Sequence, residues 1–68
     1  MTLVDARGMR CPWPALRLAR AMREGKGPVT IVADDPIAST EIAALAEERG
    51  WSVEHASTEI GEGFRVAI

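Results

Sequence analysis

The residues best suited to chemistry in this chain are Cys11 and the segment around it. Cys11 is the single cysteine of the sequence, and it opens the motif Cys11-Pro12-Trp13-Pro14. A helical pattern starts within this motif, where a proline removes a backbone donor that the first turn would leave unpaired anyway. The sequence therefore predicts that Cys11 lies at or beside the N-cap of a helix.

This position is expected to favour the thiolate form of Cys11. Free N–H groups at a helix start point toward the N-cap, and the helix dipole places partial positive charge there. Arg10 is adjacent in the sequence and Arg7 is expected nearby. We therefore expect the pKa of Cys11 to lie below the reference value of about 8.5. Because a residue before proline is confined to extended conformations, we expect the thiol at the strand–helix junction, partly exposed.

A different interpretation of Cys11 has to be weighed against this one. A lone cysteine in an intracellular protein is more often a small buried hydrophobe than a reactive group. Its place between Arg10 and Pro12 at a helix start is poorly suited to burial, which favours the reactive interpretation. Alkylation by iodoacetamide discriminates between them, because a reactive thiol requires an accessible group with a midpoint below about pH 8.5.

Six predicted elements have to position this segment. Apolar periodicity and turn residues indicate strands at 2–6, 29–33, 51–58 and 64–68, with helices at 12–24 and from Asp34-Asp35-Pro36 to Gly50. The apolar stripes of the two helices are Ala15, Leu18, Ala19 and Met22, and Ala38, Ile42, Leu45 and Ala46. Strand 51–58 has the pattern of an edge strand, and Gly61 and Gly63 are expected in the turn after it.

The order β-α-β-α-β-β predicts the fold class. Right-handed crossovers place both helices on the same face of one sheet. The expected architecture is an α/β (α+β) two-layer sandwich whose other sheet face is open and free for docking. Ligands and chemistry in open sheets collect beyond the carboxyl ends of the strands, where Cys11 is expected.

The sequence resembles a known family at these same residues. Cys11-Pro12-Trp13-Pro14, with Asp5 and Gly8 before it and Gly25 and Asp34-Asp35-Pro36 after it, is similar to the TusA/SirA-like family of small sulfur-carrier proteins. The resemblance runs from about Val4 to Ile68. It implies a βαβαββ sandwich with a mixed four-stranded sheet in the order 1-2-4-3. It also implies that Cys11 accepts sulfane sulfur from a donor protein as a persulfide and then passes it on.

Some positions depart from the pattern of that family. Met9 stands where leucine is common, Glu41 where aspartate is common, and Pro28 where an apolar residue is usual. These changes are mild for the fold. The absence of a second cysteine matters more, because a mechanism with two thiols in one chain is excluded and Cys11 has to work by exchange between molecules.

Length and composition restrict the class of protein. Sixty-eight residues allow one domain, 1–68, and the 47% of hydrophobic residues argues against wholesale disorder. The longest uncharged stretch, 27–33, is far shorter than the ~20 residues of a membrane span, and the start lacks the apolar run of a signal peptide. With one cysteine there is no internal disulfide and no cysteine zinc site, so a reducing cytoplasm is the expected compartment.

The charges are unevenly distributed along the chain. The net charge is −2, yet residues 1–26 carry six basic and two acidic side chains, whereas residues 27–68 carry two basic and eight acidic ones. Arg17, Arg20 and Arg23 on the first helix either steer an acidic partner toward Cys11 or are solvated surface. RNA binding is disfavoured by a pI near 5.2 and few aromatic residues. Phosphate-loop, dinucleotide and C-x-x-C metal motifs are absent.

Three other features have an ordinary structural interpretation beside a functional one. Trp13 is either an anchor for a partner protein or local packing over the helix start. Asp34 and Asp35 are more easily explained as a helix N-cap than as an acid–base pair or a cation site. His55 lacks neighbours at ligand spacing and is interpreted as a surface histidine.

The leading hypothesis is a cytoplasmic sulfur carrier without cofactor or metal. Its donor is a cysteine desulfurase or a rhodanese-like sulfurtransferase, and a second protein accepts the sulfur. Cys11 reacts, while the residues around it shape the loop and bind partners: Arg10, Pro12, Trp13, Pro14, Arg17 and Arg20. Whether to call such a carrier an enzyme is partly semantic, because it is both acceptor and donor. The alternative is a non-catalytic interaction or regulatory module that uses the open sheet face.

Overall fold

The chain folds into four strands and two helices. The structure is a computed structural model that describes residues 2–25 and 27–68. The elements, in chain order, are β1 (Thr2–Asp5), α1 (Trp13–Glu24), β2 (Val29–Val32), α2 (Ala38–Arg49), β3 (Ser52–Thr58) and β4 (Gly61–Ala67). The strands form one sheet in the order β1-β2-β4-β3, with β1 parallel to β2 and the other two pairings antiparallel. This confirms the predicted mixed sheet and the prediction of β3 as an edge strand.

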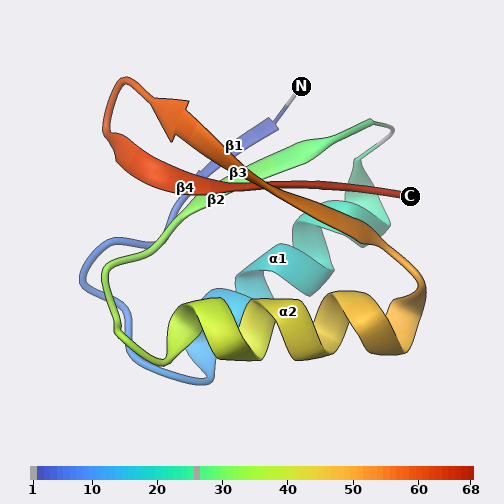
Figure 1. Cartoon of the computed structure of the whole chain (residues 1–68), viewed down its shortest axis with the longest axis horizontal. Helices are drawn as coiled ribbons and strands as arrows, with labels where there is room; N and C mark the ends of the chain where they lie inside the picture. Colours follow the sequence, from blue (N-terminus) through green and yellow to red (C-terminus); the bar gives the residue numbers. More distant parts are fainter. Residues whose placement is uncertain (1, 26) are drawn as a thin grey trace.

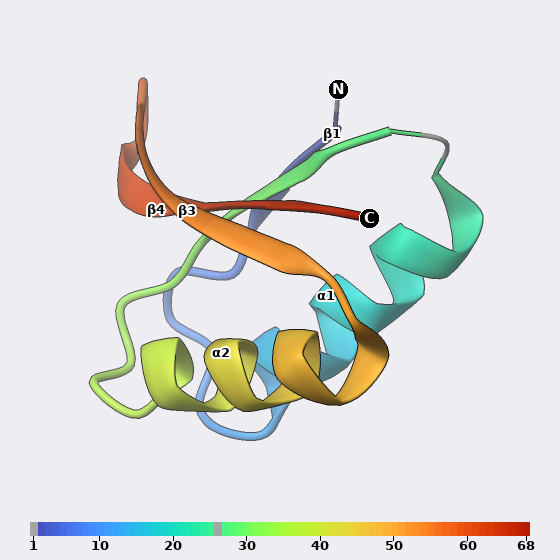
Figure 2. The ribbon, with the colours of Figure 1, turned by 45° about the vertical axis from the view of Figure 1, so that its right-hand side comes forward.

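The molecule has two layers, and both helices cover the same face of the sheet (Figures 1 and 2). The core lies between the layers, and β2 is buried along its whole length, as its continuous β-branched pattern predicts. The buried residues of the core cluster are Val4, Ala6, Leu18, Met22, Val29, Ile31, Ala38, Ile42 and Val66. In the described residues, no helix is long and apolar enough to cross a membrane.

Helix α1 buries a stripe that differs in part from the predicted one. Pro14, Leu18 and Met22 are buried, at spacings of four residues, while Ala15 and Ala19 are only partly buried beside them. The prediction was right for Leu18 and Met22 but omitted Pro14, which is among the largest fully buried side chains. Pro14 therefore anchors the start of α1 in the core instead of being displayed with the loop.

Helix α2 begins later than predicted and ends as predicted. Gly50 follows its last residue with φ 75°, in the left-handed conformation that glycine adopts without steric cost. The predicted opening at Asp34-Asp35-Pro36 is wrong, because the N-cap residue is Ile37 and it makes no side-chain capping bond. The two aspartates are engaged elsewhere, with the loop that carries Cys11.

Strand β4 begins at Gly61, so the prediction that Gly61 and Gly63 lie in a turn is wrong. The turn consists of Glu59 and Ile60, and Gly63 is a buried strand residue paired with Ala56. A Cβ atom on Gly63 would overlap the carbonyl group of Ile31 on β2. The glycine is required by this close approach of two backbones and not by a turn.

Candidate functional site

Two loops meet at the carboxyl ends of the parallel strands β1 and β2. The loop after β1 carries Cys11 and leads to α1, and the loop after β2 leads to α2; both run along the same end of the molecule (Figures 1 and 2). The Gly8 N–H donates to Asp34 Oδ1 at 2.9 Å, and the Cys11 N–H donates to Asp35 Oδ2 at 2.8 Å. The parallel pairing brings the loops together, and the aspartates then fix one loop to the other.

Asp35 holds the backbone of Cys11 and the approach to α2 at the same time. Its Oδ1 accepts a hydrogen bond from the Ile37 N–H at 2.9 Å, while its Oδ2 accepts the bond from Cys11. The N–H groups of Ile37 and Cys11 hold the pKa of the Asp35 carboxyl below its usual range, with a smaller contribution from the charge of Arg10. Asp35 is therefore not the N-cap of α2 as expected; it connects the two loops instead.

The thiol of Cys11 faces a carboxylate. Its Sγ is partly buried and donates a hydrogen bond to Glu41 Oε1 at 3.0 Å. This bond, together with desolvation and the negative charges of Glu41 and Asp35, raises the pKa of Cys11 above its usual value. The prediction of a lowered pKa is wrong, because acids on the side of α2 face the sulfur.

Several of the groups expected to stabilise the thiolate are occupied or cannot donate. Helix α1 begins one residue after Pro12, and neither Pro12 nor Pro14 has an N–H, while the Trp13 N–H donates to the carbonyl oxygen of Arg10 at 2.9 Å. Cys11 thus precedes the N-cap residue and makes no capping bond. The guanidinium of Arg7, expected near the thiol, is instead bound to Asp5, with Nε 2.9 Å from Oδ1.

The exposed rim of this site consists of residues next to Cys11. Arg10 and Pro12 are exposed, the Cys11–Pro12 peptide bond is cis, and Trp13 is 60% exposed. The accessible side chain of Trp13 lies next to a partly exposed thiol, where a second protein can cover both.

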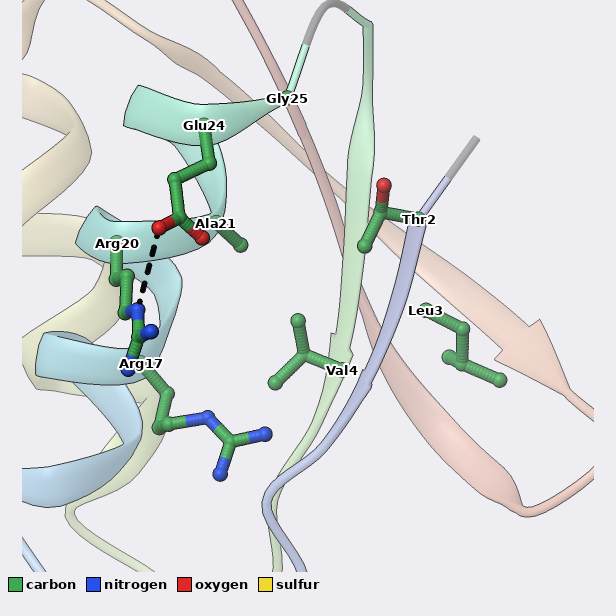
Figure 3. A pocket seen from close by; sticks show the side chains of 8 residues that line it. All are labelled: Thr2, Leu3, Val4, Arg17, Arg20, Ala21, Glu24 and Gly25. Carbon is green, nitrogen blue, oxygen red and sulfur yellow. Dashed lines mark hydrogen bonds and ion pairs between the residues drawn. The ribbon is translucent and has the colours of Figure 1, made fainter.

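Two of the predicted arginines line a hollow between α1 and β1. Figure 3 shows Arg17 and Arg20 projecting from α1, with the guanidinium of Arg17 reaching toward β1. Arg20 pairs with Glu24 at 3.4 Å, and both of these side chains are largely exposed. The hollow measures about 590 Å³ and is lined by Thr2, Leu3, Val4, Arg17, Arg20, Ala21, Glu24 and Gly25. Arg17 and Arg20 therefore lie on the side of α1 that faces β1, whereas the thiol of Cys11 contacts Glu41 on α2.

His55 lies on β3, where it lines a hollow together with Asp34 and Asp35. Its Nε2 is 3.3 Å from Glu62 Oε1, its ring meets that of Phe64 edge to face, and its side chain is exposed. Within residues 2–25 and 27–68, no group of three or more His, Cys, Asp or Glu side chains is arranged to hold a metal ion. The position of His55 agrees with a surface histidine.

Glu41 is the site residue that the sequence reasoning missed. The sequence shows it only as a mild departure from a family pattern, yet its side chain makes the direct contact with the thiol. A signal for it existed, because the loops after two neighbouring parallel strands meet, which brings acids near 34–41 toward Cys11. The contact itself joins residues thirty positions apart, and no local pattern indicates it.

Known proteins resemble this chain in sequence and in fold. A family model described as sulfurtransferase TusA matches residues 2–68. A protein of Archaeoglobus fulgidus, described as a candidate sulfur carrier protein, is 38% identical over 52 residues, which cover 74% of this chain and 68% of that protein. The crystal structure of a SirA-like protein from Desulfitobacterium hafniense superposes with a TM-score of 0.78 at 28% identity, covering 98% of this chain and 95% of the other.

Proposed function

The chain belongs to the sulfurtransferase TusA family and is a TusA-like sulfur carrier. We propose that Cys11 is the residue that carries the transferred sulfur atom, as a persulfide. The observation that carries this proposal is the place of the only sulfhydryl of the sequence. It is partly exposed, it lies where two loops meet, and its backbone is fixed by Asp35. A carried sulfur atom on this residue is within reach of another protein.

The proposed transfer consists of two exchanges that involve one sulfur atom. Cys11 loses its proton to solvent, and its thiolate attacks the outer sulfur of a persulfide on the donor protein. The sulfur–sulfur bond of the donor breaks, the donor cysteine leaves as a thiolate and takes up a proton, and Cys11 becomes a persulfide. A thiolate of the acceptor protein then attacks the outer sulfur on Cys11, which returns to its original form. No cofactor, metal or external oxidant is needed.

Residues around Cys11 supply the contacts with partners in this proposal. Arg10, Pro12 and Trp13 form the exposed rim, Pro14 anchors the loop, and Arg17 and Arg20 attract an acidic surface. The donor is a cysteine desulfurase or a rhodanese-like sulfurtransferase, and the acceptor is a second protein. Because a lone carrier thiol has to remain reduced, we place the relay in the cytoplasm.

The test is sulfur loading of the intact protein by a donor. A cysteine desulfurase with cysteine, or a rhodanese-like protein with thiosulfate, is incubated with the chain, and the mass of the intact protein is measured. We expect a gain of one sulfur atom that a reducing agent reverses, and no gain for Cys11→Ser. A protein that gains no sulfur, while each donor forms its own persulfide, contradicts the proposal and favours an interaction module.

The Cys11→Ser variant is a suitable control because it should fold normally. A serine hydroxyl can donate to Glu41 as the thiol does, and the bond from the backbone of residue 11 to Asp35 is unaffected. We expect its melting temperature to be close to that of the wild type. A large loss of thermal stability would mean that the thiol belongs to the core, which is incompatible with its exposure.

A further inference from the structure

The contact between Cys11 and Glu41 joins the sulfur to a charge on another element. Glu41 lies in the first turn of α2 and is partly buried, and its Oε1 is 3.0 Å from Sγ of Cys11. Asp35, in the loop before α2, holds the backbone of Cys11 at 2.8 Å, so the cysteine cannot move away freely. The charges that act on the thiol come from these two acids, and the exposed Arg10 acts on Asp35.

A carboxylate in this place affects two chemical states of Cys11 in opposite ways. The protonated thiol is stabilised by donating its hydrogen to Glu41, whereas a thiolate at the same position is repelled by the carboxylate. When sulfur departs from a persulfide, the cysteine left behind is released as a thiolate, and a thiol that ionises with difficulty leaves slowly. The contact with Glu41 therefore works against the release of sulfur.

We propose that Glu41 controls how long Cys11 retains a carried sulfur atom, by disfavouring the thiolate that release generates. This inference rests on the proposed role of Cys11 and adds a tuning residue to it. In the release step the acceptor thiolate bonds to the outer sulfur, the sulfur–sulfur bond on Cys11 breaks, and its electron pair goes to Sγ. That sulfur emerges beside the Glu41 carboxylate and has to recover a proton from solvent or from the acceptor. Loading requires the thiolate of Cys11, so the same contact also lowers the fraction of the protein that is ready to accept sulfur.

The experiment measures release of sulfur from Glu41→Gln without any partner protein. The amide of glutamine keeps an acceptor oxygen for the thiol and removes the charge. Cys11 is loaded with inorganic polysulfide, excess reagent is removed, and cyanide is added, so that cyanide takes the outer sulfur as thiocyanate and leaves the cysteine thiolate. We expect Glu41→Gln to form thiocyanate about three- to tenfold faster than the wild type at neutral pH.

A matched control separates this effect from a general loss of charge. Glu47→Gln makes the same change on an exposed position of the same helix, and we expect its release rate to equal that of the wild type. Glu41→Asp keeps the charge but withdraws it by one methylene. We expect its rate of thiocyanate formation to lie between those of the wild type and Glu41→Gln. Both variants at position 41 are compared by circular dichroism and thermal melting, so that a misfolded protein is recognised before its rate is interpreted.

A second measurement is made on the unloaded protein. The pH midpoint of iodoacetamide alkylation should shift to lower pH in Glu41→Gln and remain unchanged in Glu47→Gln, because only Glu41 contacts the thiol. If folded Glu41→Gln releases sulfur at the wild-type rate or more slowly, or if its midpoint does not move, the inference is wrong. Polysulfide loads the thiol without a partner, so failure of donor loading would overturn the proposed function and leave this result standing.

Discussion

At the scale of single residues, two carboxylates hold Cys11 in different ways. Asp35 accepts a hydrogen bond from its backbone, and Glu41 accepts one from its thiol. The first bond fixes where the cysteine lies and the second fixes which protonation state is favoured. The pKa of Cys11 is raised as a result, so this thiol is accessible without being highly ionised. Its reactivity then depends on how strongly these acids disfavour its ionisation.

The backbone bond leads to a prediction about stability in acid. Because hydrogen bonds from Ile37 and Cys11 hold the pKa of Asp35 below its usual range, the carboxylate stabilises the fold above its unfolded pKa of about 4. That contribution is lost as the pH falls through the lowered folded value. Asp35→Asn should therefore melt at a lower temperature than the wild type at pH 6, and the difference should shrink toward pH 2.

Thermal melting followed by circular dichroism at several pH values checks this expectation. Glu59→Gln, in the exposed turn between β3 and β4, provides a control that removes one carboxylate without touching either loop. Its melting curve should follow the wild type across the series. A difference between Asp35→Asn and the wild type that stays constant with pH would mean that the charge of Asp35 does not support the loop contact.

At the scale of elements, the sequence predicts those features of helices and strands that neighbouring residues determine. The left-handed Gly50 ends α2 as expected, and the continuous β-branched run of β2 is buried as expected. The start of α2 and the role of Gly63 were not predictable in this way. Asp34 and Asp35 accept hydrogen bonds from a loop that precedes them by more than twenty residues. Gly63 is required because the carbonyl of Ile31 on another strand lies too close for a Cβ atom. The strand order indicates that the loops after β1 and β2 meet, but sequence spacing does not identify which atoms come into contact.

In the site, too, features set by neighbouring residues could be predicted, and features set by contacts distant in the sequence could not. Cys11 and its exposed neighbour Trp13 could be located from the motif, because prolines at a helix start restrict the chain locally. The protonation of the thiol could not be predicted, since it depends on Glu41 from a different helix. A helix start was expected to act on the sulfur, but two prolines leave it few donors.

Gly63 provides a test of how the central strands are packed. Gly63→Ala would place a methyl group against the carbonyl of Ile31, and the strands would have to separate. We expect a loss of at least about 2 kcal/mol in the free energy of unfolding, measured by urea denaturation. Gly27→Ala is the matched control, because a Cβ there meets nothing within 4 Å, and it should change stability by less than about 0.5 kcal/mol. Equal stability of the two variants would contradict the close approach of β2 and β4.

At the scale of the whole molecule, the fold separates a surface with basic side chains on α1 from the acids that face Cys11. Basic side chains of α1 line the hollow against β1 (Figure 3), while the thiol itself faces acids from the side of α2. Under the proposed function, a partner would be attracted by one set of charges and would meet the opposite sign at the sulfur of Cys11. Attraction at long range affects the rate of encounter, whereas the contact at the sulfur affects the chemistry after encounter.

The last prediction concerns that rate of encounter. If Arg17 and Arg20 steer an acidic donor toward Cys11, the double change Arg17→Gln and Arg20→Gln removes the attraction and keeps good helix formers in α1. We expect transfer from the donor to slow about tenfold or more at low salt, and to converge with the wild type near about 0.5 M salt, where screening is strong. Stopped-flow transfer assays at several ionic strengths measure both limits.

A variant with the same change in net charge decides whether position matters. Arg49 ends α2, and Arg65 lies on β4, where it pairs with Glu54 at 3.2 Å. Arg49→Gln with Arg65→Gln should transfer sulfur at close to the wild-type rate at every ionic strength, because neither side chain lines the hollow beside α1. Alkylation of Cys11 by neutral iodoacetamide should differ little among the three proteins, since that reagent is not steered. Equal slowing of both double variants would show that only net charge matters. If transfer by the Arg17→Gln, Arg20→Gln variant is unchanged, those arginines have no role in steering and are simply solvated.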